Sequence, residues 1–168
     1  EHGGVSRTGR MSRTDEDLVA SSLAGDPPAF DLLVLRWHRK IQGAIFRLMG
    51  SEEEARDLCQ EAFLKAYRGL GGFKGEARFS SWLYQIALNL CRDRMRRRRG
   101  RVLVSLDALE AEGQGAVLRA EASTHDLVEA RDLQERVRAA VMALPDDQRE
   151  VIVLKEYEGL TFQEIAEV

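Results

Sequence analysis

Apolar residues recur about every 3.6 positions along most of the chain, which predicts helices and not strands. The clearest apolar face follows two prolines and comprises Phe30, Leu33, Val34, Trp37, Ile41, Ile45 and Leu48. Asp26 before Pro27 is typical of a helix start, and Gly50 is typical of a helix end. A shorter helix is predicted over 15–24. Because no alternation of period two is visible, the fold is predicted to be all-α.

Two more helices are predicted in the N-terminal half. Ser51 and Glu54 form a capping-box pattern, and the helix they open is predicted to bury Ala55, Leu58, Cys59, Ala62, Phe63, Ala66 and Tyr67. Ser80 or Ser81 is expected to cap the next helix, which should end near Gly100. Its predicted inner face is Trp82, Leu83, Ile86, Ala87 and Leu90.

The periodic pattern breaks over 101–126, which predicts a flexible acidic linker. The helix that follows is predicted to bury Leu127, Leu133, Val137, Val141 and Leu144. A short apolar helix over 151–157, a turn and a capping box at Thr161 and Glu164 then resemble the beginning of a helix-turn-helix. The second, base-reading helix of such a motif would come after the last residue.

These patterns predict two small helical domains joined by a flexible linker. Residues 1–12 are expected to be a tag or a disordered extension. The first domain is expected to span 13–100 and the second, an incomplete domain, to span 127–168. Cys59 and Cys91 both fall on apolar helix faces, so we expect buried structural thiols in a reducing cytoplasm.

The net charge of −3 hides a strong asymmetry. Residues 1–101 hold 19 basic and 13 acidic side chains, a sum of +6, whereas 102–168 hold 6 basic and 15 acidic ones, a sum of −9. Seven arginines lie between Arg92 and Arg101. A basic half is typical of proteins that bind a polyanion, and the acidic half is expected to have another task.

No catalytic constellation is visible. The histidines lie far apart, outside any metal-ligand spacing, and the glycines form no phosphate-binding loop. We therefore expect neither an enzyme nor a metal or cofactor site. No apolar run reaches the roughly 20 residues that span a bilayer, so no membrane insertion is expected.

One polar stripe is a candidate nucleic-acid surface. Gln85, Asn89, Arg92 and Arg96 recur at helical spacing, opposite the predicted apolar face of the same helix. Arginine neutralises phosphates, and asparagine and glutamine read base edges. A merely solvated basic face is the alternative. The loop before this helix carries aromatic residues and adds exposed candidates for nucleic-acid contact. Phe79 and Trp82 are expected to be core residues.

Four segments, in the order of the family, resemble those of bacterial extracytoplasmic-function (ECF) sigma factors. Residues 57–68 (DLCQEAFLKAYR), 73–79 (FKGEARF) and 82–89 (WLYQIALN) resemble region 2 of that family, and 143–166 resembles the start of its region 4. The resemblance implies two helical domains and a promoter-specificity subunit of RNA polymerase. Such a subunit binds core enzyme and helps open the −10 element by capturing a flipped base.

The resemblance also assigns residues and partners. The helix over 57–68 matches the surface that docks on the coiled coil of the largest polymerase subunit, which implies roles for Asp57, Gln60, Glu61, Lys65 and Arg68. Promoter DNA is expected at Lys74, Gly75, Glu76, Ala77, Arg78, Phe79, Gln85, Asn89, Arg92, Arg96 and Arg97. The polymerase flap, an anti-sigma factor and a cytoplasmic, nucleoid-associated location are implied as well.

From the residues alone, two other functions stay open besides that of a sigma factor. A helical regulator that binds DNA without polymerase would carry the same basic stripe. An interaction module whose two helical units clamp a partner helix is the third. The helix that reads the −35 element in the family should follow Ala166, so the chain as given is not expected to read that element.

Overall fold

The computed structural model describes residues 13–106 and 125–168, and side chains in these ranges outside 101–131. All regular elements of these ranges are helical, which confirms the all-α prediction. They are α1 (Asp15–Leu23), α2 (Pro27–Met49), α3 (Glu52–Gly69), the 3₁₀ turn η2 (Leu70–Gly72), α4 (Phe79–Leu106), α5 (His125–Met142), α6 (Asp146–Ile152), the π-helical turn η3 (Val153–Tyr157) and α7 (Phe162–Ala166). The expected extension 1–12 and most of the expected linker lie outside the described residues.

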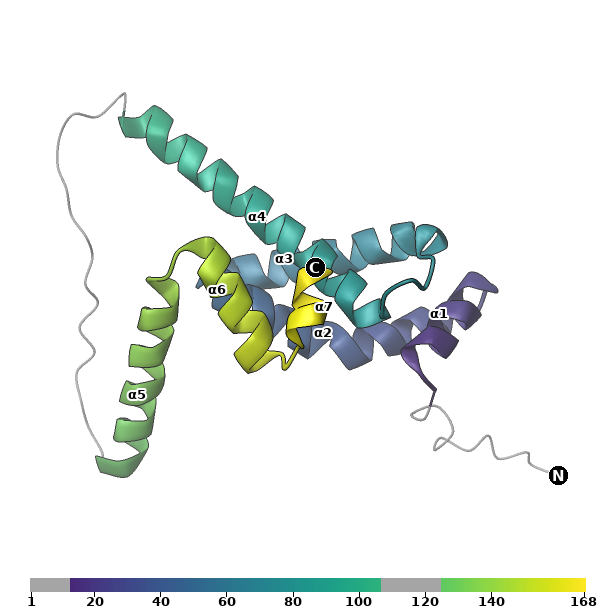
Figure 1. The fold of residues 1–168 in the computed structure, drawn as a ribbon, viewed down its shortest axis with the longest axis horizontal. Helices are drawn as coiled ribbons and strands as arrows, with labels where there is room; N and C mark the ends of the chain where they lie inside the picture. The colour runs from purple at the N-terminus through teal and green to yellow at the C-terminus, as the bar shows by residue number, and fades with distance from the viewer. Residues whose placement is uncertain (1–12, 107–124) are drawn as a thin grey trace.

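Helices α1 to α4 form a bundle around one apolar core, in which α2 packs against α1, α3 and α4 (Figure 1). The predicted faces of α2 and α3 supply much of this core, with Leu33, Ile45 and Leu58 at most 1% exposed. Tyr67 is an exception, because its ring lies 56% exposed at the surface of α3. It packs edge-on against Phe30, with 5.0 Å between ring centroids.

The boundaries of α2 follow from local chemistry. Asp26 occupies the N-cap position, but its side chain makes no capping hydrogen bond. The two prolines after it have no N–H to donate. The first free amide, that of Ala29, bonds to the carbonyl oxygen of Asp26 instead. At the other end Gly50 takes a left-handed φ of 73°, which ends the helix as expected.

The capping box predicted at Ser51 is only half formed. The Ser51 hydroxyl accepts from the amide of Glu54, but the Glu54 carboxylate does not return the bond. It lies instead 3.5 Å from Arg94 and 2.9 Å from Arg98 of α4. A tertiary ion pair has therefore displaced half of a local motif and ties α3 to the arginine-rich part of α4.

Two predictions about α4 are wrong. The helix begins at Phe79, so Ser80 and Ser81 lie inside it and do not cap it. It also continues through Gly100 to Leu106. A single interior glycine costs about 1 kcal/mol relative to alanine, which good helix formers on either side can offset.

Helices α5, α6 and α7 with η3 form a C-terminal unit that packs on α2 (Figure 1). Val153, Leu154 and Leu160 are buried in the same apolar cluster as the bundle. The face predicted to be inward on α5 is only partly covered. Leu133 is 60% and Val137 43% exposed, whereas Val141 and Leu144 are half-buried. The side chain of Leu127 lies outside the described residues. The capping box at Thr161 and Glu164 forms in full and opens α7.

Candidate nucleic-acid interface

The predicted polar stripe lies on the outer side of α4. Asn89, Arg92, Arg96 and Arg97 are exposed and Gln85 is half-buried, while Leu83, Ala87 and Leu90 of the same helix are buried. The Asn89 side-chain oxygen accepts a 3.4 Å hydrogen bond from Arg92. The helix thus brings together an amide and several guanidinium groups, a combination suited to base edges and phosphates.

The loop before α4 is held by aromatic packing. Phe73 lies 5.1 Å from Trp82 and 6.1 Å from Phe79, measured between ring centroids. Phe79 is fully buried, as the core interpretation expected, so its side chain is not at the surface. Of the other predicted loop residues Ala77 is half-buried and the rest are exposed, namely Lys74, Gly75, Glu76 and Arg78.

The residues predicted to contact core polymerase all lie exposed on α3: Asp57, Gln60, Glu61, Lys65 and Arg68. Lys65 pairs with Glu61 at 3.4 Å, one helical turn away. Beside them an open groove of about 540 Å³ runs between α2 and α3. Apolar side chains from both helices line much of it: Phe30, Val34, Phe63, Leu64 and Tyr67. The predicted core-binding residues are all polar, so the prediction missed the apolar strip on the same surface.

Sequence reasoning also missed a set of contacts between α4 and the C-terminal unit. The buried Tyr84 hydroxyl donates a 2.6 Å hydrogen bond to Glu158. Burial, and then this bond to a carboxylate, raises the pKa of Tyr84. Glu158 also pairs with Arg47 at 3.3 Å. Since these partners are 74 and 111 positions apart in sequence, no local pattern could identify them.

The C-terminal unit also contacts the polar stripe of α4. Arg92 donates from Nε and Nη2 to the Glu150 carboxylate, with distances of 3.2, 3.0 and 2.7 Å. Glu150 is 7% exposed. The opposite charge sums of the two halves were the one signal in the sequence that could have pointed to this pairing.

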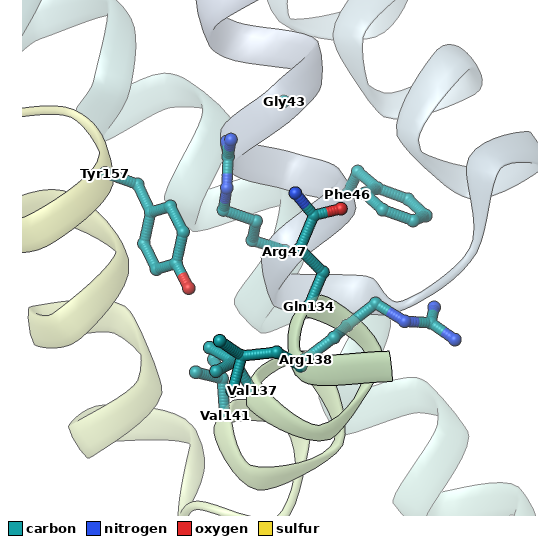
Figure 2. A pocket seen from close by; sticks show the side chains of 9 residues that line it. Gly43, Phe46, Arg47, Gln134, Val137, Arg138, Val141 and Tyr157 are labelled. Carbon is teal, nitrogen blue, oxygen red and sulfur yellow. The ribbon is translucent and has the colours of Figure 1, made fainter. Parts of the chain in front are cut away.

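A second groove, of about 480 Å³, lies where α5 faces α2 and η3 (Figure 2). Val137 and Val141 of α5 face Phe46 and Arg47 of α2 across it, with Tyr157 at its side. The exposed face of α5 therefore contributes one wall of an open, mostly apolar groove.

Both cysteines are free and buried, as predicted. Burial raises the pKa of the Cys59 thiol to about 11. Burial, with smaller contributions from Glu150 and Glu54, raises that of Cys91 to about 12. Within the described ranges no three His, Cys, Asp or Glu side chains gather as a metal site. Among the helices of those ranges, none has the length and apolar content that crossing a bilayer requires.

Two family models match the chain. The model described as Sigma-70 region 2 matches residues 33–101, and the one described as Sigma-70, region 4 matches 134–168. The first match contains the α4 stripe and the loop before it, as well as the exposed face of α3. The second contains the carboxylates that contact α4.

Curated relatives are similar along most of the chain. The RNA polymerase sigma-H factor of Pseudomonas aeruginosa is 38% identical over 158 residues, which cover 92% of this chain and 81% of the relative. The ECF RNA polymerase sigma-E factor of Escherichia coli K12 is 37% identical over 158 residues, with coverages of 92% and 82%.

Two solved structures have a similar fold. CnrH, in complex with the cytosolic domain of CnrY, superposes with a TM-score of 0.65 at 27% identity, covering 91% of this chain and 80% of CnrH. The sigma factor RpoE of Bartonella quintana, in complex with the anti-sigma factor NepR, gives 0.59 at 26% identity, with coverages of 82% and 80%.

Proposed function

This chain belongs to the ECF sigma factors of the sigma-70 family, and from that membership we propose how it directs transcription initiation. It binds core RNA polymerase and carries the enzyme to promoters. There it recognises the −10 element and helps open it by capturing a flipped base. The observation that carries this proposal is the outer stripe of α4, where Asn89 lies one turn from Arg92 and continues into the exposed arginines.

The two predicted domains divide this work. We assign the core-binding and −10-binding surfaces to residues 13–100, the connecting segment to 101–126 and the region 4 domain to 127–168. On α3 we assign core binding to Asp57, Gln60, Glu61, Lys65 and Arg68, of which Gln60 lines the apolar groove between α2 and α3. An apolar strip beside charged residues is a common composition for a protein interface. On the loop and α4 we assign DNA contacts to Lys74, Gly75, Glu76, Ala77, Arg78, Gln85, Asn89, Arg92, Arg96 and Arg97.

The chemistry is binding without turnover. Charged side chains hold phosphates, an amide reads a base edge, and the loop before α4 offers backbone and side-chain contacts to an extruded base. The protein is then a regulatory subunit and not an enzyme, and it acts in the cytoplasm where the chromosome lies. Phe79 supports the loop from the core and is not a direct contact.

An anti-sigma factor is the proposed regulatory partner. The solved structures of CnrH and of the Bartonella sigma factor contain the cytosolic domain of CnrY and the anti-sigma factor NepR. In this chain the groove between α5 and α2, with Val137, Val141 and Phe46 on its walls, supplies an open apolar surface of the kind a partner helix covers.

The decisive experiment is transcription by core polymerase supplemented with this protein on matched promoters. Promoter-dependent initiation is the expected result. Initiation equal to that of core enzyme alone would refute the proposal. Tight binding of duplex DNA without any affinity for core enzyme would instead identify a regulator that acts without polymerase.

Two variants separate the proposed surfaces. Asn89→Ala should weaken promoter opening, seen by permanganate footprinting, and leave core binding unchanged. Gln60→Ala with Leu64→Ala should weaken core binding. Gln148→Ala, an exposed change on α6, is the control for both measurements. Equal loss of core binding and opening in Asn89→Ala would contradict the role given to that amide.

A further inference from the structure

The arginine cluster of α4 is divided between two sides of the helix. Arg92 and Arg96 belong to the polar stripe and lie about one turn apart. Arg94 lies two residues from each of them, which is just over half a turn, and Arg98 follows Arg94 by about one turn. Arg94 and Arg98, called the inner arginines below, therefore lie on the side of α4 opposite to Arg92 and Arg96, the outer arginines.

The inner arginines continue the buried side of the helix. Ala87 and Cys91 of that side are at most 2% exposed. Arg94 and Arg98 follow Cys91 in steps of three and four residues, the steps at which one helix face recurs. The side chain of Arg94 is 35% exposed, against 78% for Arg96. Because these positions face the bundle, their charges need a partner there.

Glu54, in the first turn of α3, is that partner. Its side chain is 15% exposed and lies 3.5 Å from Arg94 and 2.9 Å from Arg98. Its Oε2 is buried, and within the described ranges no donor is aligned with this oxygen for a hydrogen bond, so the contact with Arg98 is a charge pair. One carboxylate thus holds both inner arginines against α3.

The pairing lies where α4 leaves the bundle (Figure 1). Met95, at 9% exposed, is the last buried residue of α4 among those whose side chains are described. Further along, a Cβ added at Gly100 would meet no atom of the described residues within 4 Å. An interior glycine also weakens a helix. The contacts of Glu54 are therefore in a position to fix the direction in which the arginine-rich end of α4 leaves α3.

We propose that Glu54 is a positioning residue for promoter opening, which holds the inner arginines on α3 and so fixes the side of α4 on which Asn89 and the outer arginines meet DNA. The inference rests on the proposed function, because it assumes that the stripe binds DNA. The inner arginines fasten the helix and do not contact phosphates. The arginine cluster, uniform in sequence, thus has two separate tasks.

The ionic strength dependence of DNA binding separates the two tasks. An arginine that neutralises a phosphate releases counterions, and for duplex DNA each such contact adds about 0.9 to the slope of log affinity against log salt. The inner arginines already face a carboxylate. If they moved to DNA, Glu54 would stay largely buried without a partner, which is strongly destabilising. We therefore expect them to contribute nothing to the slope.

The first test compares two double variants of equal charge and equal spacing. Arg94→Gln/Arg98→Gln removes the inner arginines, and Arg92→Gln/Arg96→Gln removes the outer ones. Anisotropy of a fluorescein-labelled DNA duplex of mixed sequence, titrated at several salt concentrations, gives the slope. The outer variant should lower the slope by about 2, and the inner variant should leave it unchanged. Equal reductions in both variants would overturn the division of the arginines.

The second test addresses the position of the helix. Glu54→Gln removes the partner of the inner arginines, and Glu53→Gln removes the same charge from the exposed neighbouring position. With core polymerase, permanganate reactivity of promoter thymines should fall about threefold or more in Glu54→Gln relative to Glu53→Gln, with equal core binding. Hydrogen exchange of the backbone amides over 94–100 should be faster in Glu54→Gln alone. Equal opening and equal exchange in the two variants would overturn the positioning role.

An apolar replacement distinguishes fastening from charge. Glu54→Met/Arg94→Met keeps the net charge and puts two apolar side chains where the ion pair was, an exchange that is often neutral for stability. It should restore slow hydrogen exchange and promoter opening. Slow exchange with opening as poor as in Glu54→Gln would overturn the positioning role. Hydrogen exchange is measured without polymerase, whereas a failure of the proposed function would appear as absent initiation with the unaltered protein, so the two failures are distinguishable.

Discussion

The bundle and the C-terminal unit use the same helical periodicity with opposite outcomes. In α2 and α3 most of the periodic apolar positions are core residues, such as Leu33 and Leu58 at no more than 1% exposed. In α5 the equally periodic Leu133 is 60% exposed. A period of about 3.6 residues reveals which face of a helix is apolar, but a neighbouring element decides whether that face is covered. The bundle is thus a closed core, and α5 presents an open surface.

The largest expected difference is in stability. Leu58→Ala should lower the free energy of unfolding by about 2–5 kcal/mol, because it leaves a cavity among buried side chains. Leu133→Ala removes the same atoms from an exposed position and should change it by less than about 0.5 kcal/mol. Urea denaturation followed by circular dichroism measures both. Equal losses would mean that α5 is covered in solution.

The bundle and α5 should also differ in the reactivity of their cysteine thiols. At pH 8 the raised pKa values of Cys59 and Cys91 keep both thiols protonated, and burial blocks their access. A cysteine at Val137, which is 43% exposed, should react with iodoacetamide at least about a hundredfold faster. Mass spectrometry over time gives the three rates. Reaction of the native thiols as fast as Val137→Cys would show that the core of the bundle opens readily.

The raised pKa values of the two thiols also make the folding stability depend on pH. Because the folded state holds the thiol protons to higher pH than the unfolded chain does, folding stability falls as pH rises above the ordinary thiol value of 9.0 and through about 11 to 12. The fall should be smaller in Cys59→Ala, measured by urea denaturation between pH 8 and pH 10. An unchanged slope in that variant would contradict the contribution of Cys59.

A smaller effect is expected where the two regions meet. Gly50 has a φ of 73°, and a Cβ on it would lie 2.9 Å from Met142 Cε of α5. Gly50→Ala should therefore cost about 1–2 kcal/mol, chiefly from the left-handed backbone, since the methionine end can move. Gly71→Ala, with nothing within 4 Å of its added Cβ, is the control. Thermal melts of both variants give the comparison.

The smallest effect tests the hydrogen bond between the regions. Tyr84→Phe deletes the hydroxyl that donates to Glu158 and should destabilise the chain by about 1 kcal/mol. Tyr67→Phe changes a ring that is 56% exposed and should have little effect. Matched denaturation curves compare them. A larger loss in Tyr67→Phe would show that the hydroxyl of Tyr84 does not stabilise the junction.

Local chemistry was the predictable part of the fold. The helix end at Gly50 and the capping box at Thr161 depend on residues within one turn, and both form. The candidate surface on α4 was likewise visible, because helical spacing alone places its polar residues on one side, whereas the surface on α3 was implied by the family resemblance. Their roles in binding polymerase and DNA remain predictions.

Long-range pairing was the unpredictable part. The carboxylate of Glu54 contacts Arg94 and Arg98 instead of completing a local cap. Tyr84 is buried and donates a hydrogen bond to Glu158, 74 positions away. These outcomes depend on which helices meet, and periodicity carries no information about that. The opposite charges of the two halves indicated complementarity, but not which residues would use it.

The uninterrupted length of α4 has a geometric consequence. At 1.5 Å per residue its 28 residues form a rod of about 42 Å, and its far end extends well beyond the bundle (Figure 1). A continuous helix also fixes angle: each residue turns the next by about 100°. One residue inserted between Asn89 and Arg96 would swing the arginines about a quarter-turn away from the amide. The α4 helix thus sets both the spacing along its axis and the angle around it at which its charged side chains meet the DNA.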